Sequence, residues 1–557
     1  MNPKIALNRL AALKTTYGPG SGATRLALVR AACRGRFRTA AQVTLLHELL
    51  CFIHAYPDDE QEFAEADRHL RAFHARPDLR RAARTLINSG IAGADIVYPF
   101  GFSTARWLAE RWGDRLTIEW TEIGNRSALE TRLHLFSLWG ERPVFDEPPL
   151  EGRAWLDRLR GRETDAAFVI RRCEALPVRG LTAEYLYDEL GLTVRVSPGK
   201  TTPRRTGARV PGRPVVTQEK PLRTVRPDLR AEMQIPPRRI RALGKAEAGR
   251  YLDLARESMV TRSRDLYTFT AANLQDACLV ECGDGLEFFC IGVEPEQRLL
   301  FDAVYGMLTL RNSVPIGYAL CSALWRSSEV AYNVFETFRG GESAWVYGRL
   351  LATIRAMFGA DTFTVDPYQL GHHNDEGLES GAWWFYYKLG FLPWDRKASA
   401  LASREAERVR RRKGYRTNEA TLRELVRANV FLQTGPPTRD VIGAIPVDAI
   451  GLKVTNLVAA RFGSNRELAT EALADEASVR LGGVAWRRLP AGARLFWERW
   501  APIVALLPEI DRWSDADRRA LVEIIKAKGG RRESDFVARF DAHPRLGAAL
   551  AALARRR

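Results

Sequence analysis

The chain has 557 residues, of which 46% are hydrophobic, so it holds enough apolar material for several packed domains and is not expected to be disordered. No apolar stretch approaches the roughly 20 residues that a membrane-spanning helix needs, so we expect no membrane partner. Its 84 Lys and Arg residues against 67 Asp and Glu residues give a net charge of +17, which favours anionic partners such as phosphorylated small molecules and nucleic acid.

Residues 1–196 are predicted to form a mainly helical N-terminal domain. Apolar side chains recur at helical spacing in two stretches, and Pro57 with the two aspartates that follow it supplies the turn between them. Residues 114–122 and 192–198 alternate between apolar and polar side chains, which is typical of strands. We therefore expect helices with a small amount of sheet, and no motif here indicates a function.

Residues 197–237 are rich in Pro and Arg and lack apolar periodicity. We expect either an exposed, partly extended linker or a strap that lies across a neighbouring domain. The density of arginines leaves a further alternative open, in which this segment contacts nucleic acid or another acidic surface.

Residues 238–398 have the mixed pattern of an α/β domain. A helix is predicted around residues 244–260. The predicted strands are apolar or alternating runs bounded by turn residues, and they cover 286–293, 301–310, 314–325, 328–338 and 361–368. A helix with apolar side chains at every fourth residue is predicted to end at Gly359, and an aromatic helix follows at residues 381–391.

Residues 399–557 are predicted to form a helical C-terminal domain, because helical apolar spacing returns there. Six residues near its start, from Arg408 to Lys413, include five basic side chains. We interpret this run as a solvated helix face, with contact to nucleic acid as the alternative.

Two motifs stand in a fixed order within the α/β region. A strand ending at Phe338 leads into the turn RGGESA at residues 339–344, and the aromatic helix contains AWWFYYKLGF at residues 382–391. Together they resemble the GNAT superfamily of N-acyltransferases, in which a glycine-rich strand-to-helix turn precedes a helix with a Tyr-x-Lys-Leu-Gly-Phe ending. The resemblance implies an α/β fold with a central mixed sheet and packed helices, which the mainly helical N- and C-terminal domains flank.

Acyl-CoA is the co-substrate that this resemblance implies. Free N–H groups at the start of a helix can bind a pyrophosphate with the help of the helix dipole. In the family, the pantetheine arm lies where the strand before the turn splays from the next strand, and those strands would be 330–338 and 362–366. The implied binding residues are Phe338, Arg339, Gly340, Gly341, Ser343 and Ala344.

Glu342 stands where the family has its first key glycine. A carboxylate next to a bound pyrophosphate would repel it. We expect the Glu342 side chain to turn outward and pair with Arg339, which would leave the site open; otherwise the turn would bind something other than coenzyme A, or nothing.

The resemblance implies that Tyr386 is the general acid for the leaving thiolate, with Tyr387 as the alternative if the register is shifted by one residue. An amine nucleophile must also lose a proton before it attacks the thioester carbonyl. The candidate bases are Glu329 and Glu336 on the strand before the turn, with Glu329 favoured and the paired histidines at 372–373 as further options.

The predicted function is direct transfer of an acyl group from acyl-CoA to an amine, carried by a small molecule or a protein. Two alternatives are an aminoacyl-tRNA-dependent transferase on the same fold, and a non-enzymatic scaffold that binds nucleic acid through its Arg-rich segments. We expect no metal, because His47, Cys51 and His54 share a helix face but lack a fourth ligand. Seven thinly spread cysteines and no convincing secretion signal indicate reduced thiols and a cytoplasmic protein.

Overall fold

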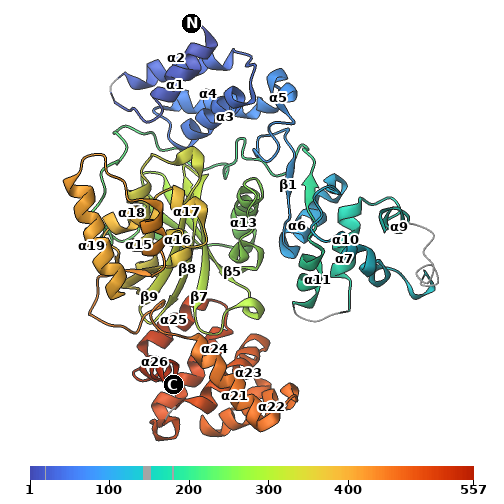
Figure 1. Ribbon diagram of the computed structural model, residues 1–557, viewed down its shortest axis with the longest axis vertical. Helices are drawn as coiled ribbons and strands as arrows, with labels where there is room; N and C mark the ends of the chain where they lie inside the picture. The colour runs from blue at the N-terminus through green and yellow to red at the C-terminus, as the bar shows by residue number, and fades with distance from the viewer. Residues whose placement is uncertain (19, 142–151, 178–180, 508, 557) are drawn as a thin grey trace. The chain divides into compact units, whose positions relative to one another are not determined.

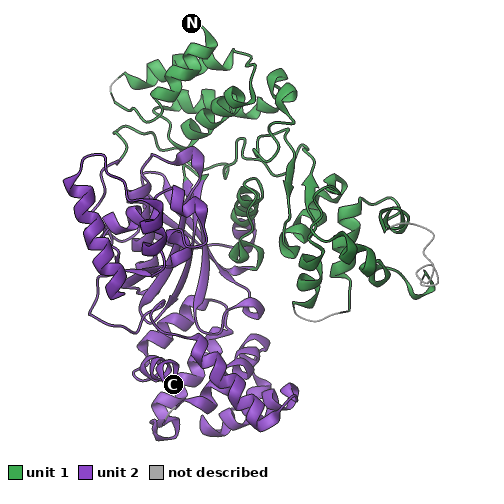
Figure 2. Cartoon of the chain, in the orientation of Figure 1, with its two compact units in different colours: residues 1–222, 250–271, 311–315 green, residues 223–249, 272–310, 316–557 purple. Residues whose placement is uncertain are grey.

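A computed structural model describes residues 1–18, 20–141, 152–177, 181–507 and 509–556 (Figure 1). These residues form two compact units, coloured separately in Figure 2. Unit 1 holds residues 1–222, 250–271 and 311–315, and unit 2 holds residues 223–249, 272–310 and 316–557. These units differ from the four expected segments. The strands of the expected α/β domain and the helices of the expected C-terminal domain belong to the same unit, unit 2.

Unit 1 is mainly helical and contains a three-stranded sheet in the order β1-β3-β2. The strands expected at 114–122 and 192–198 are confirmed as the short β2 and β3, and β1 was not expected. The strands are β1 (Ile96–Tyr98), β2 (Leu116–Ile118) and β3 (Val194–Val196). The helices are α1 (Pro3–Ala12), α2 (Ser21–Cys33), α3 (Ala40–Ala55), α4 (Glu60–Arg71), α5 (Pro77–Ala82), α6 (Phe102–Trp112), α7 (Arg126–Arg132), α9 (Gly152–Leu159), α10 (Asp165–Glu174), α11 (Thr182–Leu190) and α14 (Tyr267–Thr270).

The Pro- and Arg-rich segment packs as a strap rather than as a solvated linker. Within unit 1, the Thr206 hydroxyl lies 2.8 Å from the buried His47 ring, and Gln218 donates its N–H to a backbone carbonyl at 2.7 Å. Within unit 2, Leu229 and Met233 are buried in the hydrophobic core. The strap therefore loses solvent exposure at several points along its length.

Unit 2 is built on a nine-stranded mixed sheet in the order β11-β12-β10-β9-β8-β7-β6-β5-β4, which confirms the expected α/β class. The pairs β5–β6 and β8–β9 are antiparallel, β9–β10 is parallel, and β10–β12 is antiparallel. The strands are β4 (Arg239–Ala242), β5 (Ala272–Gly283), β6 (Leu286–Val293), β7 (Ala303–Arg311), β8 (Val314–Leu324), β9 (Ser327–Val334), β10 (Thr362–Val365), β11 (Leu392–Pro393) and β12 (Val430–Gln433).

Tight turns connect the central strands. Asp284 and Gly285 both take positive φ between β5 and β6, and Asn312 and Ser313 do so between β7 and β8, as two-residue hairpin turns of the primed type require. Trp325 and Arg326 take the same conformation, with φ of 52° and 50°, between β8 and β9. These turns set the register between each strand and the next along the chain.

Helices cover the sheet of unit 2 (Figure 1). Further helices, α21–α26, follow its last strand, β12, along the chain. The expected helix ending at Gly359 is confirmed as α15, and Gly359 caps it in the left-handed conformation. None of the helices in the described ranges combines the length and apolar character that crossing a bilayer requires. The helices are α12 (Leu229–Glu232), α13 (Lys245–Val260, which continues into unit 1), α15 (Ser343–Phe358), α16 (Pro367–Leu370), α17 (Asp375–Glu379), α18 (Ala382–Lys388), α19 (Arg396–Arg411), α20 (Glu419–Leu425), α21 (Asp448–Phe462), α22 (Arg466–Arg480), α23 (Ala491–Leu506), α24 (Asp515–Lys528), α25 (Glu533–Ala542) and α26 (Leu546–Arg555).

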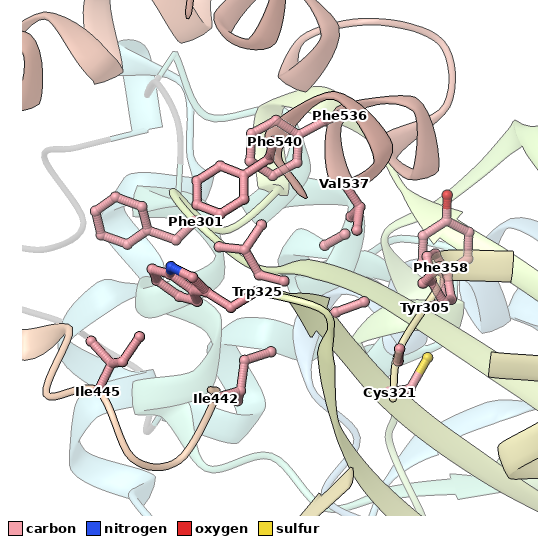
Figure 3. Close-up of a cluster of buried hydrophobic side chains, with 14 of the residues drawn as sticks. Phe301, Tyr305, Cys321, Trp325, Phe358, Ile442, Ile445, Phe536, Val537 and Phe540 are labelled. Atoms are coloured by element: carbon pink, nitrogen blue, oxygen red, sulfur yellow. The ribbon is translucent and has the colours of Figure 1, made fainter. Parts of the chain in front are cut away.

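Residues 399–557 were expected to form a helical domain of their own. They also contribute a strand to the sheet of unit 2 and side chains to its core. Strand β12 lies in this segment and pairs with β10, so that Phe431 is opposite Thr364. Figure 3 shows Phe536, Val537 and Phe540 of α25 above the strands, near Trp325 and Phe301. The rings of Trp325 and Phe540 meet edge to face at 5.4 Å, so one core joins the sheet to the C-terminal helices.

Candidate functional site

The turn between β9 and α15 is tight and depends on glycine. After β9 the chain forms a single 3₁₀ turn, Glu336–Phe338, and then passes through Gly340, whose φ of +83° is a conformation that side chains rarely adopt. A Cβ atom at Gly340 would meet no heavy atom within 4 Å, so open space lies beside this residue. The turn thus brings a bare stretch of backbone to the start of α15.

Backbone N–H groups at the start of α15 precede the first helical hydrogen bond. That bond is donated by Val346 to the Glu342 carbonyl at 2.9 Å, and Glu342 gives the helix no side-chain cap. The N–H groups of Ser343, Ala344 and Trp345 therefore lie at the positive end of the helix dipole without a helical acceptor. Such a helix start is a general anion-binding arrangement.

Glu342 points inward, so the expectation that it turns outward to Arg339 is wrong. Its side chain is buried, accepts the backbone N–H of Arg223 at 3.1 Å, and lies 3.6 Å from the Arg223 guanidinium. Arg339 instead pairs with Glu376 at 2.8 Å on the surface. The strap is the cause, because it brings Arg223 over the Trp345 ring at the start of α15.

Strands β9 and β10 separate directly after Glu329. Parallel pairing joins residues 327–329 to residues 362–364 and ends at the pair Glu329–Thr364. Strand β9 stays paired with β8 as far as Val334, so it continues along the sheet while β10 ends at Val365. Residues 330–334 of β9 thus run toward the glycine turn beyond the end of the β9–β10 pairing, and we call this stretch the split.

Three tyrosines, which we call the tyrosine cluster, gather where α15 and α18 meet β9. Tyr347 of α15 lies 5.2 Å from Tyr332 of β9 and 5.5 Å from Tyr386 of α18, measured between ring centroids. Tyr347 is fully buried, and its hydroxyl has no hydrogen-bond partner among the described residues. A buried polar group of this kind normally finds a partner, so the tyrosine cluster has a donor to offer a ligand.

Tyr386 is almost completely buried, and burial raises the pKa of its hydroxyl, which therefore keeps its proton at neutral pH. The alternative residue, Tyr387, lies elsewhere on α18, where its ring stacks on Trp383 at 4.9 Å. The structure thus brings Tyr386, and not Tyr387, to the tyrosine cluster.

Glu329 is half-buried at the start of the split. Burial, and then the negative charges of Asp366 and Asp302, raise the pKa of Glu329 to about 7. Because neighbouring residues of a strand point to opposite faces, Glu329 lies on the face opposite Tyr332 and α15. Its carboxyl group is thus protonated and deprotonated in the same pH range, as a proton-transfer group needs to be.

The remaining candidates lie farther from this arrangement. Glu336 is exposed on the 3₁₀ turn, and Phe338 is buried beneath it. The rings of His372 and His373 contact each other at 4.1 Å in the loop before α17, with His373 exposed. Within the part of the chain that the structure describes, no contact places the Glu336 carboxylate or the histidine pair in the split.

Sequence reasoning missed Tyr332, Tyr347 and Arg223. Tyr347 occupies a buried position of an amphipathic helix, where an aromatic residue is ordinary, and Tyr332 has the spacing of any inward strand residue. Arg223 reaches α15 only through the path of the strap. The only sequence signal for the tyrosines is a hydroxyl on positions that otherwise carry apolar side chains.

No protein-family model matches the chain, and neither a curated protein nor a solved structure matches it. The features of the chain that bear on its function are the split, the glycine turn, the tyrosine cluster and Glu329.

Proposed function

We propose that this chain is a GNAT-like N-acyltransferase that moves an acyl group from acyl-CoA directly to an amine. The observation that carries the proposal is that the β9–β10 pairing ends at Glu329, while β9 continues to Tyr332, which contacts Tyr347 of α15 and through it Tyr386. An extended thioester arm needs such a split, because its reactive carbon must be reached from both faces of the sheet: by the amine on one face and by the proton donor on the other.

The start of α15 would hold the pyrophosphate of acyl-CoA. The N–H groups of Ser343, Ala344 and Trp345 are uncapped, and the space beside Gly340 is open. The charge of Glu342 is opposed by the Arg223 guanidinium 3.6 Å away, which reduces its repulsion of an anion. Arg339, which is exposed, would add a charge-assisted contact if it exchanged Glu376 for a phosphate.

The chemistry follows from the protonation states of Glu329 and Tyr386. The ionised Glu329 carboxylate accepts a proton from the ammonium group of the acceptor, and the freed lone pair attacks the thioester carbonyl carbon. The attacking nitrogen then loses its second proton to solvent as the carbon–sulfur bond breaks, and the departing sulfur takes the proton of the Tyr386 hydroxyl. Solvent returns a proton to Tyr386 and removes the one held by Glu329. The products are an amide and a thiol, and the Tyr347 hydroxyl would donate its unused hydrogen bond to the reacting carbonyl oxygen.

Gly340→Asp tests the pyrophosphate site. Unit charges about 5 Å apart interact by roughly 3 kcal/mol at an effective dielectric near 20, so we expect acetyl-CoA to bind at least tenfold more weakly. Gly359→Asp is the matched control, because Gly359 also has positive φ and open space around its Cβ position but caps the other end of α15. Isothermal titration calorimetry with acetyl-CoA and longer acyl-CoAs measures both variants.

Wild-type protein that releases no heat with any acyl-CoA would remove the proposal. Equal weakening by the two aspartates would show that the added charge, rather than its position at the start of α15, controls binding.

Tyr386→Phe should lower kcat by about 100-fold, within the range for loss of a general acid, and leave KM for acyl-CoA unchanged. Tyr387→Phe removes the neighbouring hydroxyl from the same helix and should leave kcat within twofold. Steady-state detection of the released thiol gives both constants. A larger loss in Tyr387→Phe than in Tyr386→Phe would reverse the assignment.

A further inference from the structure

A pocket lies at the β11–β12 edge of the sheet. Its volume is about 550 Å³, within the size range of small-molecule sites. Trp394, Phe431 and three arginines are among the residues that line it, and all of them belong to unit 2. Strand β10 separates β12 from β9, so this pocket does not belong to the split beside Glu329.

Planar groups stack along one side of the pocket. The rings of Trp394 and Phe431 lie nearly parallel, with centroids 3.8 Å apart and 12° between their planes. The Arg439 guanidinium lies 4.2 Å from the centroid of Trp394. Strand β12 holds Phe431 rigidly in register with Leu392, so the stack is fixed to the sheet. Trp394 thus lies between Phe431 and Arg439, and the guanidinium end of this stack is the surface that suits the face of a heterocyclic base.

The charge of the pocket is positive. Arg427, Arg439 and Arg555 line it with a single carboxylate, Asp395, which caps α19 by accepting the N–H of Ala398 at 2.8 Å. Arg555 pairs with Asp440 at 2.6 Å. Arg427 and Arg439 form no ion pair with any described residue, so two guanidinium groups are available to an anion. Guanidinium groups match phosphate oxygens in both charge and geometry.

We propose that this pocket binds a nucleotide, whose base stacks on the Trp394–Arg439 platform and whose phosphate contacts Arg427 and Arg439. The ligand is either a free mononucleotide or the terminal nucleotide of a single-stranded RNA, since both present the same base and phosphate. The proposal does not depend on acyl transfer, because no residue of this pocket takes part in the proposed reaction.

Titration of the full-length chain with 5′-AMP, adenosine and a 5′-phosphorylated oligoadenylate tests the proposal. We expect 5′-AMP to bind at least tenfold more tightly than adenosine, because only 5′-AMP carries the phosphate. Arg427→Ala with Arg439→Ala should weaken 5′-AMP binding at least tenfold. Arg410→Ala with Arg411→Ala removes the same charge from two exposed positions on α19 and should change the affinity less than twofold.

Trp394→Phe tests base stacking separately from charge, through the fluorescence of Trp394. This variant keeps an aromatic platform, so 5′-AMP should still bind, but the quenching of tryptophan fluorescence by the base should disappear. An oligoadenylate that binds tenfold more tightly than 5′-AMP, with the same dependence on Arg427 and Arg439, identifies RNA as the source. Equal or weaker oligoadenylate binding identifies a free nucleotide.

Two results would overturn the proposal. One is the absence of binding by both 5′-AMP and the oligoadenylate at millimolar concentration. The other is equal weakening by the pocket pair and by the Arg410 and Arg411 pair, which would mean that net charge alone attracts the nucleotide.

Discussion

Replacing Glu329 with glutamine is expected to lower kcat/KM at pH 7 by about 10²- to 10⁴-fold, the range found when a general base is removed. Glutamine keeps the size of the side chain at the end of the β9–β10 pairing but cannot accept the proton of the ammonium group. Transfer of the acetyl group to a panel of amines, followed by release of the thiol, gives the rate.

The pH profile separates loss of the base from loss of structure. Because burial and the charges of Asp366 and Asp302 raise the pKa of Glu329 to about 7, wild-type kcat/KM should rise with pH until it levels off above pH 7. Glu329→Gln should lack this ascending limb. Asp366→Asn removes one of the neighbouring negative charges, so it should lower the pKa of Glu329 and move the limb to lower pH.

Protein stability should change with pH in the opposite direction to kcat/KM, which provides a second check on Glu329. The folded-state pKa of Glu329 lies above that of an unfolded glutamate, so the folded state binds the extra proton and loses this contribution as pH rises through about 7. Glu329→Gln should therefore be at least as stable as wild type at pH 8. Glu336→Gln, at an exposed position on the next turn, should leave rate and profile unchanged. A wild-type pH profile in Glu329→Gln would exclude Glu329 as the base.

Local signals predicted those elements of the sheet that are bounded by their own turn residues. Gly283, Asp284 and Gly285 define a hairpin without help from the rest of the chain, and β6 begins and ends where expected. Gly359 likewise ends α15 as predicted. Strand β12 has only four residues, too few to show a period, and it is a strand because β10 offers it hydrogen bonds.

The residues of the candidate site also fall into two groups: those that a local sequence pattern predicted, and those whose role depends on distant contacts. The glycine turn and Tyr386 lie on short motifs, and Glu329 was suggested by its place on the strand before the turn. The inward orientation of Glu342 depends on Arg223, more than one hundred positions away in the chain, and no local pattern contains that contact. The raised pKa of Glu329 depends in the same way on its burial and then on Asp366 and Asp302, since only the folded sheet buries this side chain and brings the two aspartates near it.

Lys528→Met is expected to destabilise unit 2 by about 3 kcal/mol, the lower end of the range for removing one partner of a buried ion pair, because Arg298 also lies 3.9 Å from the Glu533 carboxylate. Lys528 is fully buried at the end of α24, where it donates to the Glu533 carboxylate at 2.5 Å and to the carbonyls of Phe301 and Asp302 at 2.9 Å. Methionine keeps most of the volume but removes the ammonium group nearest to Glu533, so that this buried carboxylate keeps only the more distant Arg298 guanidinium, at 3.9 Å, and the Val304 N–H among the described residues.

Chemical denaturation followed by far-UV circular dichroism measures the loss of stability. Lys526→Met is the matched control on the same helix, because Lys526 pairs with Glu523 at 2.8 Å in a more exposed position and should cost less than about 1 kcal/mol. Lys528→Met combined with Glu533→Gln removes both charges and should recover part of the loss, as a double-mutant cycle would reveal.

The position of the Lys528–Glu533 pair also allows a test of whether the C-terminal helices and the sheet unfold as one unit. Glu533 also accepts the N–H of Val304 in β7, and its own N–H is donated to Asp276 in β5 at 2.9 Å, so the network joins the C-terminal helices to two strands of the sheet. If these helices complete the core, loss of the ion pair should lower the unfolding midpoint of the sheet and of the helices together. Unfolding of α24–α26 alone, with acyl-CoA binding at the start of α15 preserved, would mean that the C-terminal segment is an independent domain.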